Sequence, residues 1–110
     1  MAYLKNQAYS DEDILNIIDN TSKGSFYVYV LQCFFTKTRY KFYTGYTNNI
    51  NRRFNEHKDM NVKSTKRYKG DVYLIYYEIL SSQKKAMQRE LEVKKIPRKE
   101  KISMIKNIKS

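Results

Sequence analysis

The feature that most constrains the fold of this chain is an uninterrupted run of β-branched and aromatic side chains, FYVYVLQCFF, at residues 26–35. The run shows no helical period, and its composition is typical of a strand that is buried along most of its length. A second run, YKFYTGY at residues 40–46, follows a polar turn at 36–39. Together the two runs predict a β-hairpin over residues 26–46.

Downstream of the hairpin, the sequence predicts a helix, a third strand and two more helices. Asn48 or Asn49 can cap a helix that continues to about Lys58, with Ile50 and Phe54 on its inner side. A basic loop at 61–70 and a strand at 72–80 follow. The next helix, at 82–95, is capped by Ser81 or Ser82, and Pro97 opens a last helix at 98–109. The order ββαβαα predicts a small α+β domain.

One more helix is predicted before the hairpin. Ser10 can cap it, and Asp13 occupies the capping-box position. Its apolar side consists of Ile14, Leu15, Ile17 and Ile18. Because short connections usually return to their own domain, we expect this side to pack there rather than on a partner or a second copy of the chain.

Charge divides the chain into two parts. The 110 residues include 22 Lys and Arg against 11 Asp and Glu, a net charge of +11. Residues 1–24 carry 2 basic and 4 acidic side chains, whereas residues 25–110 carry 20 basic and 7 acidic ones. We therefore predict an acidic N-terminal appendage with one short helix at 1–24 and one basic domain at 25–110. The positive excess indicates a polyanionic partner, either nucleic acid or an anionic membrane surface.

Composition excludes several classes of protein. With one cysteine, Cys33, and one histidine, His57, the chain forms no internal disulfide, Cys₄ zinc site or paired-histidine metal site. Its three glycines do not form a P-loop or a dinucleotide-binding turn. Neither a membrane span, a signal peptide nor an amphipathic helix with aromatic anchors is recognisable, so we expect a cytoplasmic protein without a membrane partner.

A carboxylate lies within the apolar stripe predicted for the helix at 82–95. Glu90 is three residues from Met87 and four from Ala86, and the stripe consists of Ala86, Met87, Leu91 and Val93. A carboxylate in such a place is costly unless a cation meets it. From the spacing alone, an ion pair with Lys94, or a helix rotated so that Glu90 reaches water, is the simpler explanation of this position.

Two further groups of residues carry possible chemistry. Arg53 and His57 lie four residues apart on one helix face, where they suit phosphate binding or proton transfer, although a solvated basic face that includes Arg52 has the same pattern. Among the eleven tyrosines, Tyr27 and Tyr29 share one face of the first strand. The second strand contributes Tyr43, Tyr46 and, between them, Gly45, which predicts a bulge or a close backbone approach.

Basic side chains interleaved with aromatic ones suit a nucleic-acid backbone, although a plain solvated loop has the same composition. The loop residues of this kind surround Tyr68, and they are Lys63, Lys66, Arg67 and Lys69. We expect further phosphate contacts from the last helix, through Arg98, Lys99, Lys101 and Lys106.

Taken in order, these segments resemble a known family, the GIY-YIG nuclease domain in its short single-domain form. The matching motifs are Val28-Tyr29-Val30, Tyr43-Thr44-Gly45, Asn51-Arg52-Arg53 with Glu56-His57, and Arg89-Glu90, within about residues 26–103. The resemblance implies a three-stranded antiparallel sheet flanked by helices. It also implies cleavage of phosphodiester bonds with one divalent cation, Mg²⁺ or Mn²⁺.

By this resemblance, Glu90 is the single metal ligand and Arg53, rather than Arg52, stabilises charge on the phosphate. Tyr43 positions or deprotonates the attacking water, Tyr29 forms a hydrogen bond beside it, and His57 shares the base role or holds phosphate.

We therefore expect a metal-dependent DNA endonuclease, with RNA as a further possible substrate and repair as one role. It uses no small-molecule cofactor, is a monomer or weak dimer, and lies in the cytoplasm or on the nucleoid. The expected nucleic-acid contacts are Lys63, Lys66, Arg67, Lys69, Arg52 and Tyr46. The alternative is a catalytically weak nucleic-acid-binding module that keeps the fold.

Overall fold

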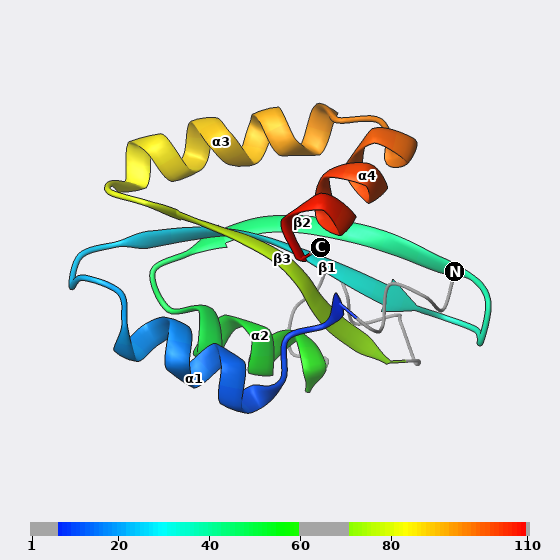
Figure 1. Ribbon diagram of the computed structural model, residues 1–110, viewed down its shortest axis with the longest axis horizontal. Coiled ribbons are helices and arrows are strands. Elements are labelled where there is room, and N and C mark those ends of the chain that lie inside the picture. Colours follow the sequence, from blue (N-terminus) through cyan, green and yellow to red (C-terminus); the bar gives the residue numbers. More distant parts are fainter. Residues whose placement is uncertain (1–6, 60–70, 110) are drawn as a thin grey trace.

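Four helices and three strands make up the described part of the computed structural model, which comprises residues 7–59 and 71–109 (Figure 1). In chain order they are α1 (Asp11–Asp19), β1 (Phe26–Phe34), β2 (Tyr40–Thr47), α2 (Ile50–Lys58), β3 (Val72–Leu80), α3 (Gln83–Lys95) and α4 (Arg98–Lys109). This order confirms the predicted α+β class, with ββαβαα preceded by one helix. The loop predicted at 61–70 lies outside the described residues.

The sheet is antiparallel and has the strand order β2-β1-β3, so β1 lies at its centre. Both faces of β1 are covered, which explains why its sequence is a continuous apolar run without alternation. On the β3 side, Val30 pairs with Tyr76 and Leu31 with Leu74, so Ile75 is the extra residue of a bulge. The bulge places Ile75 and Tyr76 in the same core cluster although they are adjacent in sequence.

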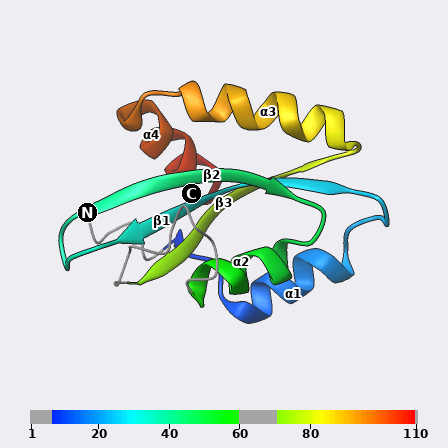
Figure 2. The same ribbon diagram turned by 180° about the vertical axis from the view of Figure 1, so that it is seen from behind.

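Two helix pairs cover opposite faces of the sheet, α1 with α2 on one and α3 with α4 on the other (Figures 1 and 2). The first core cluster holds the odd-numbered β1 side chains together with α1 and α2 residues, and it consists of Ile14, Tyr27, Tyr29, Leu31, Cys33, Ile50, Phe54 and Leu74. The second holds β1 residues Val28 and Val30 with α3 and α4 residues Ala86, Val93 and Ile105, as well as Ile75 and Tyr76. The predicted hairpin thus separates two cores of different composition.

The N-terminal helix α1 packs on its own domain. Ser10 caps it through a complete capping box with Asp13, as the sequence indicates. Ile14 is fully buried in the first core cluster, and Asp11 forms an ion pair with Lys58 of α2 at 3.2 Å. Leu15, predicted on the same apolar side, is instead 50% exposed. A nine-residue helix that meets the domain along one narrow line buries fewer aliphatic positions than its composition indicates.

The rotation of α3 corrects the predicted apolar stripe. Ala86 and Val93 are buried, but Met87 and Leu91 are 47% and 56% exposed. The row that faces the sheet is therefore Ala86, Glu90 and Val93, at i, i+4 and i+7.

A salt bridge explains this rotation. The Arg89 guanidinium, next to Glu90 in the chain, donates from Nε and Nη2 to the two carboxylate oxygens of Glu78 on β3, at 2.8 and 2.9 Å. Such a two-point, charge-assisted contact fixes which side of the helix faces the sheet. The larger side chains Met87 and Leu91 are consequently left outside.

Candidate active site

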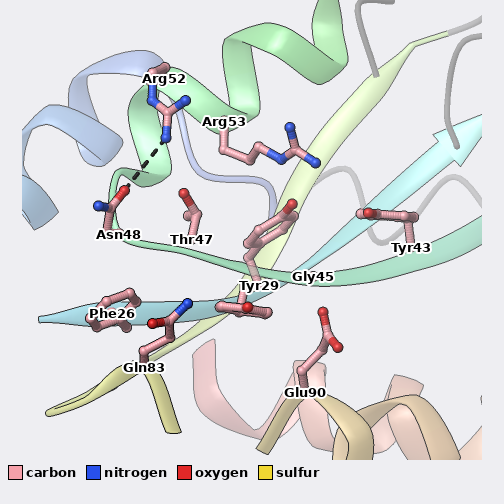
Figure 3. Close-up of a pocket in the computed structure, with 11 residues that line it drawn as sticks. Phe26, Tyr29, Tyr43, Gly45, Thr47, Asn48, Arg52, Arg53, Gln83 and Glu90 are labelled. Atoms are coloured by element: carbon pink, nitrogen blue, oxygen red, sulfur yellow. Dashed lines mark hydrogen bonds between the residues drawn. The ribbon is translucent and has the colours of Figure 1, made fainter. Parts of the chain in front are cut away.

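A cleft of about 440 Å³ opens at the β2 edge of the sheet, where α2 begins and α3 passes (Figure 3). Its lining residues come from both strands of the hairpin and from both flanking helices. They are Phe26, Tyr29, Tyr43, Gly45, Tyr46, Thr47, Asn48, Arg52, Arg53, Gln83 and Glu90. Tyr29, Tyr43, Arg53 and Glu90, which are far apart in the sequence, therefore meet at one place.

Gly45 permits the two tyrosines of the hairpin to meet over the backbone of β2. It pairs with Tyr29 across the ladder, and no bulge interrupts this part of the hairpin. A Cβ atom at position 45 would lie 2.5 Å from the Tyr29 hydroxyl oxygen and 3.1 Å from Cε1 of Tyr43. Of the two alternatives predicted for Gly45, the close approach is therefore correct, and the approaching group is a tyrosine hydroxyl.

A buried hydrogen bond joins Tyr29 to His57. The Tyr29 hydroxyl lies 3.0 Å from Nε2 of His57, and the Tyr43 ring lies 4.8 Å from the imidazole, measured between ring centroids. Burial lowers the pKa of His57 to about 4, and the positive charge of Arg53 adds to this effect. Burial also raises the pKa of Tyr29, Tyr43 adds to the rise, and Arg53 offsets part of it. At neutral pH the hydrogen bond therefore joins a neutral imidazole to a neutral phenol.

His57 lies behind the cleft rather than in it. Its side chain is fully buried, at 0% exposure, and it is not among the residues that line the cleft. Of the roles that the resemblance implied, direct phosphate binding does not agree with this position. His57 reaches the cleft through the Tyr29 hydroxyl.

Helix α2 presents two arginines to the cleft. Asn49 caps the helix by accepting a hydrogen bond from the Arg52 amide at 3.0 Å, one of the two caps predicted. Arg52 and Arg53 share the carboxylate of Glu56, at 3.4 and 3.1 Å. Arg52 is the more exposed of the two and also lies 3.5 Å from the side-chain oxygen of Asn48, whereas Arg53 is close enough to Tyr29 to influence its pKa.

Glu90 is the one carboxylate among the described residues that line the cleft. Its side chain is 16% exposed, and it forms an ion pair with Lys94 at 3.5 Å. The ion pair with Lys94 that the sequence offered as an explanation is therefore present, and Glu90 also faces the cleft.

The donor groups of the cleft fit a hard divalent cation. Glu90 supplies a carboxylate, the tyrosines supply hydroxyl oxygens, and no cluster of three His, Cys, Asp or Glu side chains occurs in the described parts of the chain. Mg²⁺ commonly binds through one or two carboxylates and takes its remaining ligands from water and substrate phosphate.

The basic residues predicted to contact nucleic acid have different positions. Arg52 and Tyr46 line the cleft. Lys101, predicted as a phosphate contact, is 7% exposed, and its ammonium lies 6.0 Å from the centre of the Phe42 ring, so that prediction is wrong. A lysine at this helix position covers the sheet with its aliphatic stem. Four predicted contacts lie outside the described residues, namely Lys63, Lys66, Arg67 and Lys69.

Sequence reasoning missed several residues of the cleft. Thr47 follows the motif tyrosines, and its hydroxyl accepts a hydrogen bond from the Asn49 amide at 3.1 Å, which shapes the turn into α2. Asn48 and Gln83 also line the cleft. A threonine two residues before a helix cap is a recognisable turn signal, but nothing in the local sequence marks Gln83 as a cleft residue.

The family model of the GIY-YIG catalytic domain matches residues 25–103. The chain belongs to the GIY-YIG family. A UPF0213 protein of Clostridium perfringens is 35% identical over 79 residues, covering 72% of this chain and 81% of that protein. A UPF0213 protein of Pediococcus acidilactici is 40% identical over 88 residues, covering 78% of this chain and 86% of that protein.

A solution NMR structure of a UPF0213 protein from Bacillus halodurans is 30% identical and has a TM-score of 0.46, covering 74% of this chain and 83% of that one. Membership of the GIY-YIG family implies nuclease activity in general and a nucleic acid as substrate. Within residues 7–59 and 71–109, no helix combines the length and the apolar character that crossing a membrane requires.

Proposed function

We propose that this protein is a metal-dependent endonuclease that hydrolyses phosphodiester bonds of DNA. The observation that carries the proposal is the convergence of Tyr29, Tyr43, Arg53 and Glu90, from β1, β2, α2 and α3, on one cleft. The net charge of +11 supports a polyanionic substrate. RNA offers the same phosphates, so the choice of DNA is part of the proposal.

Glu90 would hold the cation, Mg²⁺ or Mn²⁺. When bound, such a cation supplies Lewis-acid stabilisation of charge on the phosphate and the leaving oxygen. Arg53 acts on the same charge from the other side of the cleft, because a preorganised guanidinium stabilises negative charge that develops in the transition state. Its link to Glu56 holds the guanidinium in place before the substrate arrives.

The two tyrosines have different roles in this proposal. Tyr29 is 2% exposed and burial raises its pKa, so it keeps its proton and acts through hydrogen bonds. Tyr43 is only partly buried, and it positions the attacking water or, as the phenolate, accepts its proton. His57 is a positioning residue that fixes the orientation of the Tyr29 hydroxyl.

The alternative is a nucleic-acid-binding module with little catalytic activity, and the Glu90–Lys94 ion pair favours it. If the Glu90 carboxylate serves only to pair with Lys94, substituting Lys94 weakens the helix, and no effect of Mn²⁺ on the protein is expected. If Glu90 binds a cation, Lys94→Gln releases the carboxylate and increases the affinity for Mn²⁺.

The proposal is tested by comparing Glu90→Gln with Glu92→Gln in cleavage and in binding. Glu90→Gln is expected to abolish cleavage in Mg²⁺ while DNA affinity stays equal or increases, because a negative charge facing phosphate is removed. Glu92 is 65% exposed and pairs with Arg89, so Glu92→Gln is the matched control with near-normal activity. Full activity of Glu90→Gln in Mg²⁺ would rule out the metal assignment.

A further inference from the structure

A second hollow lies at the far end of the hairpin, away from the cleft. It has a volume of about 300 Å³, and we refer to it as the hairpin hollow. The turn between β1 and β2 forms one side, and the start of α4 forms the other. Its lining residues are Phe35, Thr38, Arg39, Tyr40, Lys41 and Arg98.

Three of these lining residues are cations, and none is a carboxylate. None of the salt bridges among the described residues involves Arg39, Lys41 or Arg98. Other basic side chains are neutralised by carboxylates, namely Arg52, Arg53, Lys58, Arg89 and Lys94. The hairpin hollow therefore concentrates positive charge without an acidic partner, which is the electrostatic pattern of a phosphate-binding site.

Aromatic rings hold the two arginines. The Arg98 guanidinium carbon lies 4.1 Å from the centre of the Tyr40 ring, and one of its amino groups donates to the Tyr40 carbonyl at 3.4 Å. The Arg39 guanidinium carbon lies 5.3 Å from the centre of the Phe35 ring. Stacking uses the face of a guanidinium and leaves N–H groups at its edge for a planar or tetrahedral anion.

The turn that carries Arg39 is closed by its own hydrogen bonds. The Thr36 hydroxyl accepts from the Arg39 amide at 3.0 Å, and the Phe35 amide donates to the Arg39 carbonyl at 3.1 Å. Arg39 is therefore presented from a defined backbone, so binding an anion there does not require the turn to form first.

Residues of the edge strand β2 line both the hollow and the cleft. In Figure 1 this strand runs from the β1–β2 turn towards α2. Tyr40 lines the hollow and Gly45, five positions further along the strand, lines the cleft. At about 3.4 Å per residue, this corresponds to roughly 17 Å. Phosphates on one strand of B-DNA advance about 3.4 Å each along the helix axis and also wind around it, so a straight span of ~17 Å corresponds to only a few nucleotides of one strand.

We propose that the hairpin hollow is a second phosphate-binding site, which holds the DNA backbone a few nucleotides from the phosphate in the cleft. The choice of DNA rests on the proposed function, whereas the site itself does not depend on cleavage. The hairpin hollow determines the path of the DNA across the protein and the length of duplex that is needed to contact both sites.

Equilibrium binding tests this proposal without cleavage. Fluorescence anisotropy with a labelled DNA duplex, in EDTA and over a range of salt, is measured for Arg39→Gln, Arg98→Gln and Lys37→Gln. Lys37 is exposed in the same turn but does not line the hollow, so it is the matched control. Losing one phosphate contact lowers the log–log salt slope by about 0.9 and weakens binding roughly threefold to fivefold at low salt.

We expect these losses for Arg39→Gln and Arg98→Gln and a smaller change for Lys37→Gln. Equal changes in Lys37→Gln and Arg39→Gln, or no change in either arginine variant, would overturn the proposal. Thermal melting verifies that each variant is folded. Arg98 packs on the Tyr40 ring, whereas Arg39 lies in an exposed turn. If Arg98→Gln does not fold, the result for Arg39→Gln alone decides the test.

Duplex length gives a second, independent readout. In wild type, affinity is expected to rise steeply once a duplex is long enough to reach both sites, whereas in Arg39→Gln the rise is shallow. Identical length dependence in the two proteins contradicts the proposal. Failure to detect cleavage in any DNA leaves this binding result unchanged, so it contradicts only the proposed function.

Discussion

The two faces of the sheet are built from different kinds of side chains. The face under α3 and α4 is largely aliphatic, with Val28, Val30, Val93 and Ile105 fully buried. The face under α1 and α2 buries Tyr29 together with His57, joined by a hydrogen bond. Burying polar groups is costly unless they are paired, so the second face carries a constraint that packing alone does not require.

This difference indicates how the cleft is constructed. The α1/α2 face orients the hydroxyl groups and Arg53, and the α3/α4 face supplies Glu90 from a helix held by the Arg89–Glu78 salt bridge. Changes on the α1/α2 face are therefore expected to alter activity with modest effects on stability. Changes in the aliphatic core of the α3/α4 face are expected to alter stability first.

The largest effect is expected at Arg53. Arg53→Ala lowers the cleavage rate at least ~10²-fold, because a preorganised charge stabiliser is lost. Single-turnover cleavage rates and DNA affinity are measured for this variant and for Arg52→Ala, which shares the same Glu56 partner and is expected mainly to weaken binding. A greater loss of rate in Arg52→Ala contradicts the assignment of the two arginines.

A comparable loss is expected when the contact between β2 and Tyr29 is disturbed. In Gly45→Ala, the added methyl group meets the Tyr29 hydroxyl at 2.5 Å. Since Tyr29 is buried and bonded to His57, it cannot move freely, and small displacements of catalytic groups cost roughly 10²-fold in rate.

Cleavage rate and thermal melting of Gly45→Ala are compared with those of Ile105→Ala. Ile105 is fully buried on the opposite face, so its variant is expected to melt at a lower temperature and to keep its specific activity. Wild-type activity in Gly45→Ala means that the placement of Tyr29 has no part in cleavage.

The smallest effect concerns pH and stability. In the folded protein the pKa of His57 is lowered from 6.5 to about 4, so the unfolded chain binds the proton more readily. The contribution of His57 to the free energy of unfolding is fully present above pH 6.5. It falls as the pH is lowered towards 4 and changes little below that pH. Urea unfolding between these limits is expected to show a steeper loss of stability in wild type than in His57→Gln, and parallel profiles contradict the buried, neutral state.

The sequence predicted the elements better than it predicted their rotations. Helix caps at Ser10, Asn49 and Ser82 are local signals, and the structure confirms all three. The rotation of α3 depends on Arg89 meeting Glu78, eleven residues away on another element, which no periodicity reveals.

The cleft residues that the sequence predicted differ in the same way from those that it did not. Tyr29, Tyr43, Arg53 and Glu90 were found because an ordered set of motifs resembles one family, although each motif alone is weak. Gln83 reaches the cleft only through the position of α3 across the β2 edge. The hairpin hollow was missed for a related reason, since Arg39 and Arg98 meet through the tertiary structure.

The most direct test of the central claim is cleavage by the wild-type protein of branched, flapped, single-stranded and duplex DNA, each in Mg²⁺, Mn²⁺ or EDTA. The account predicts that at least one of these DNAs is cut in Mg²⁺ or Mn²⁺ and that none is cut in EDTA, because the proposed mechanism requires a cation on the Glu90 carboxylate. Cleavage that continues in EDTA, or binding of every DNA without cleavage in either metal, would contradict it.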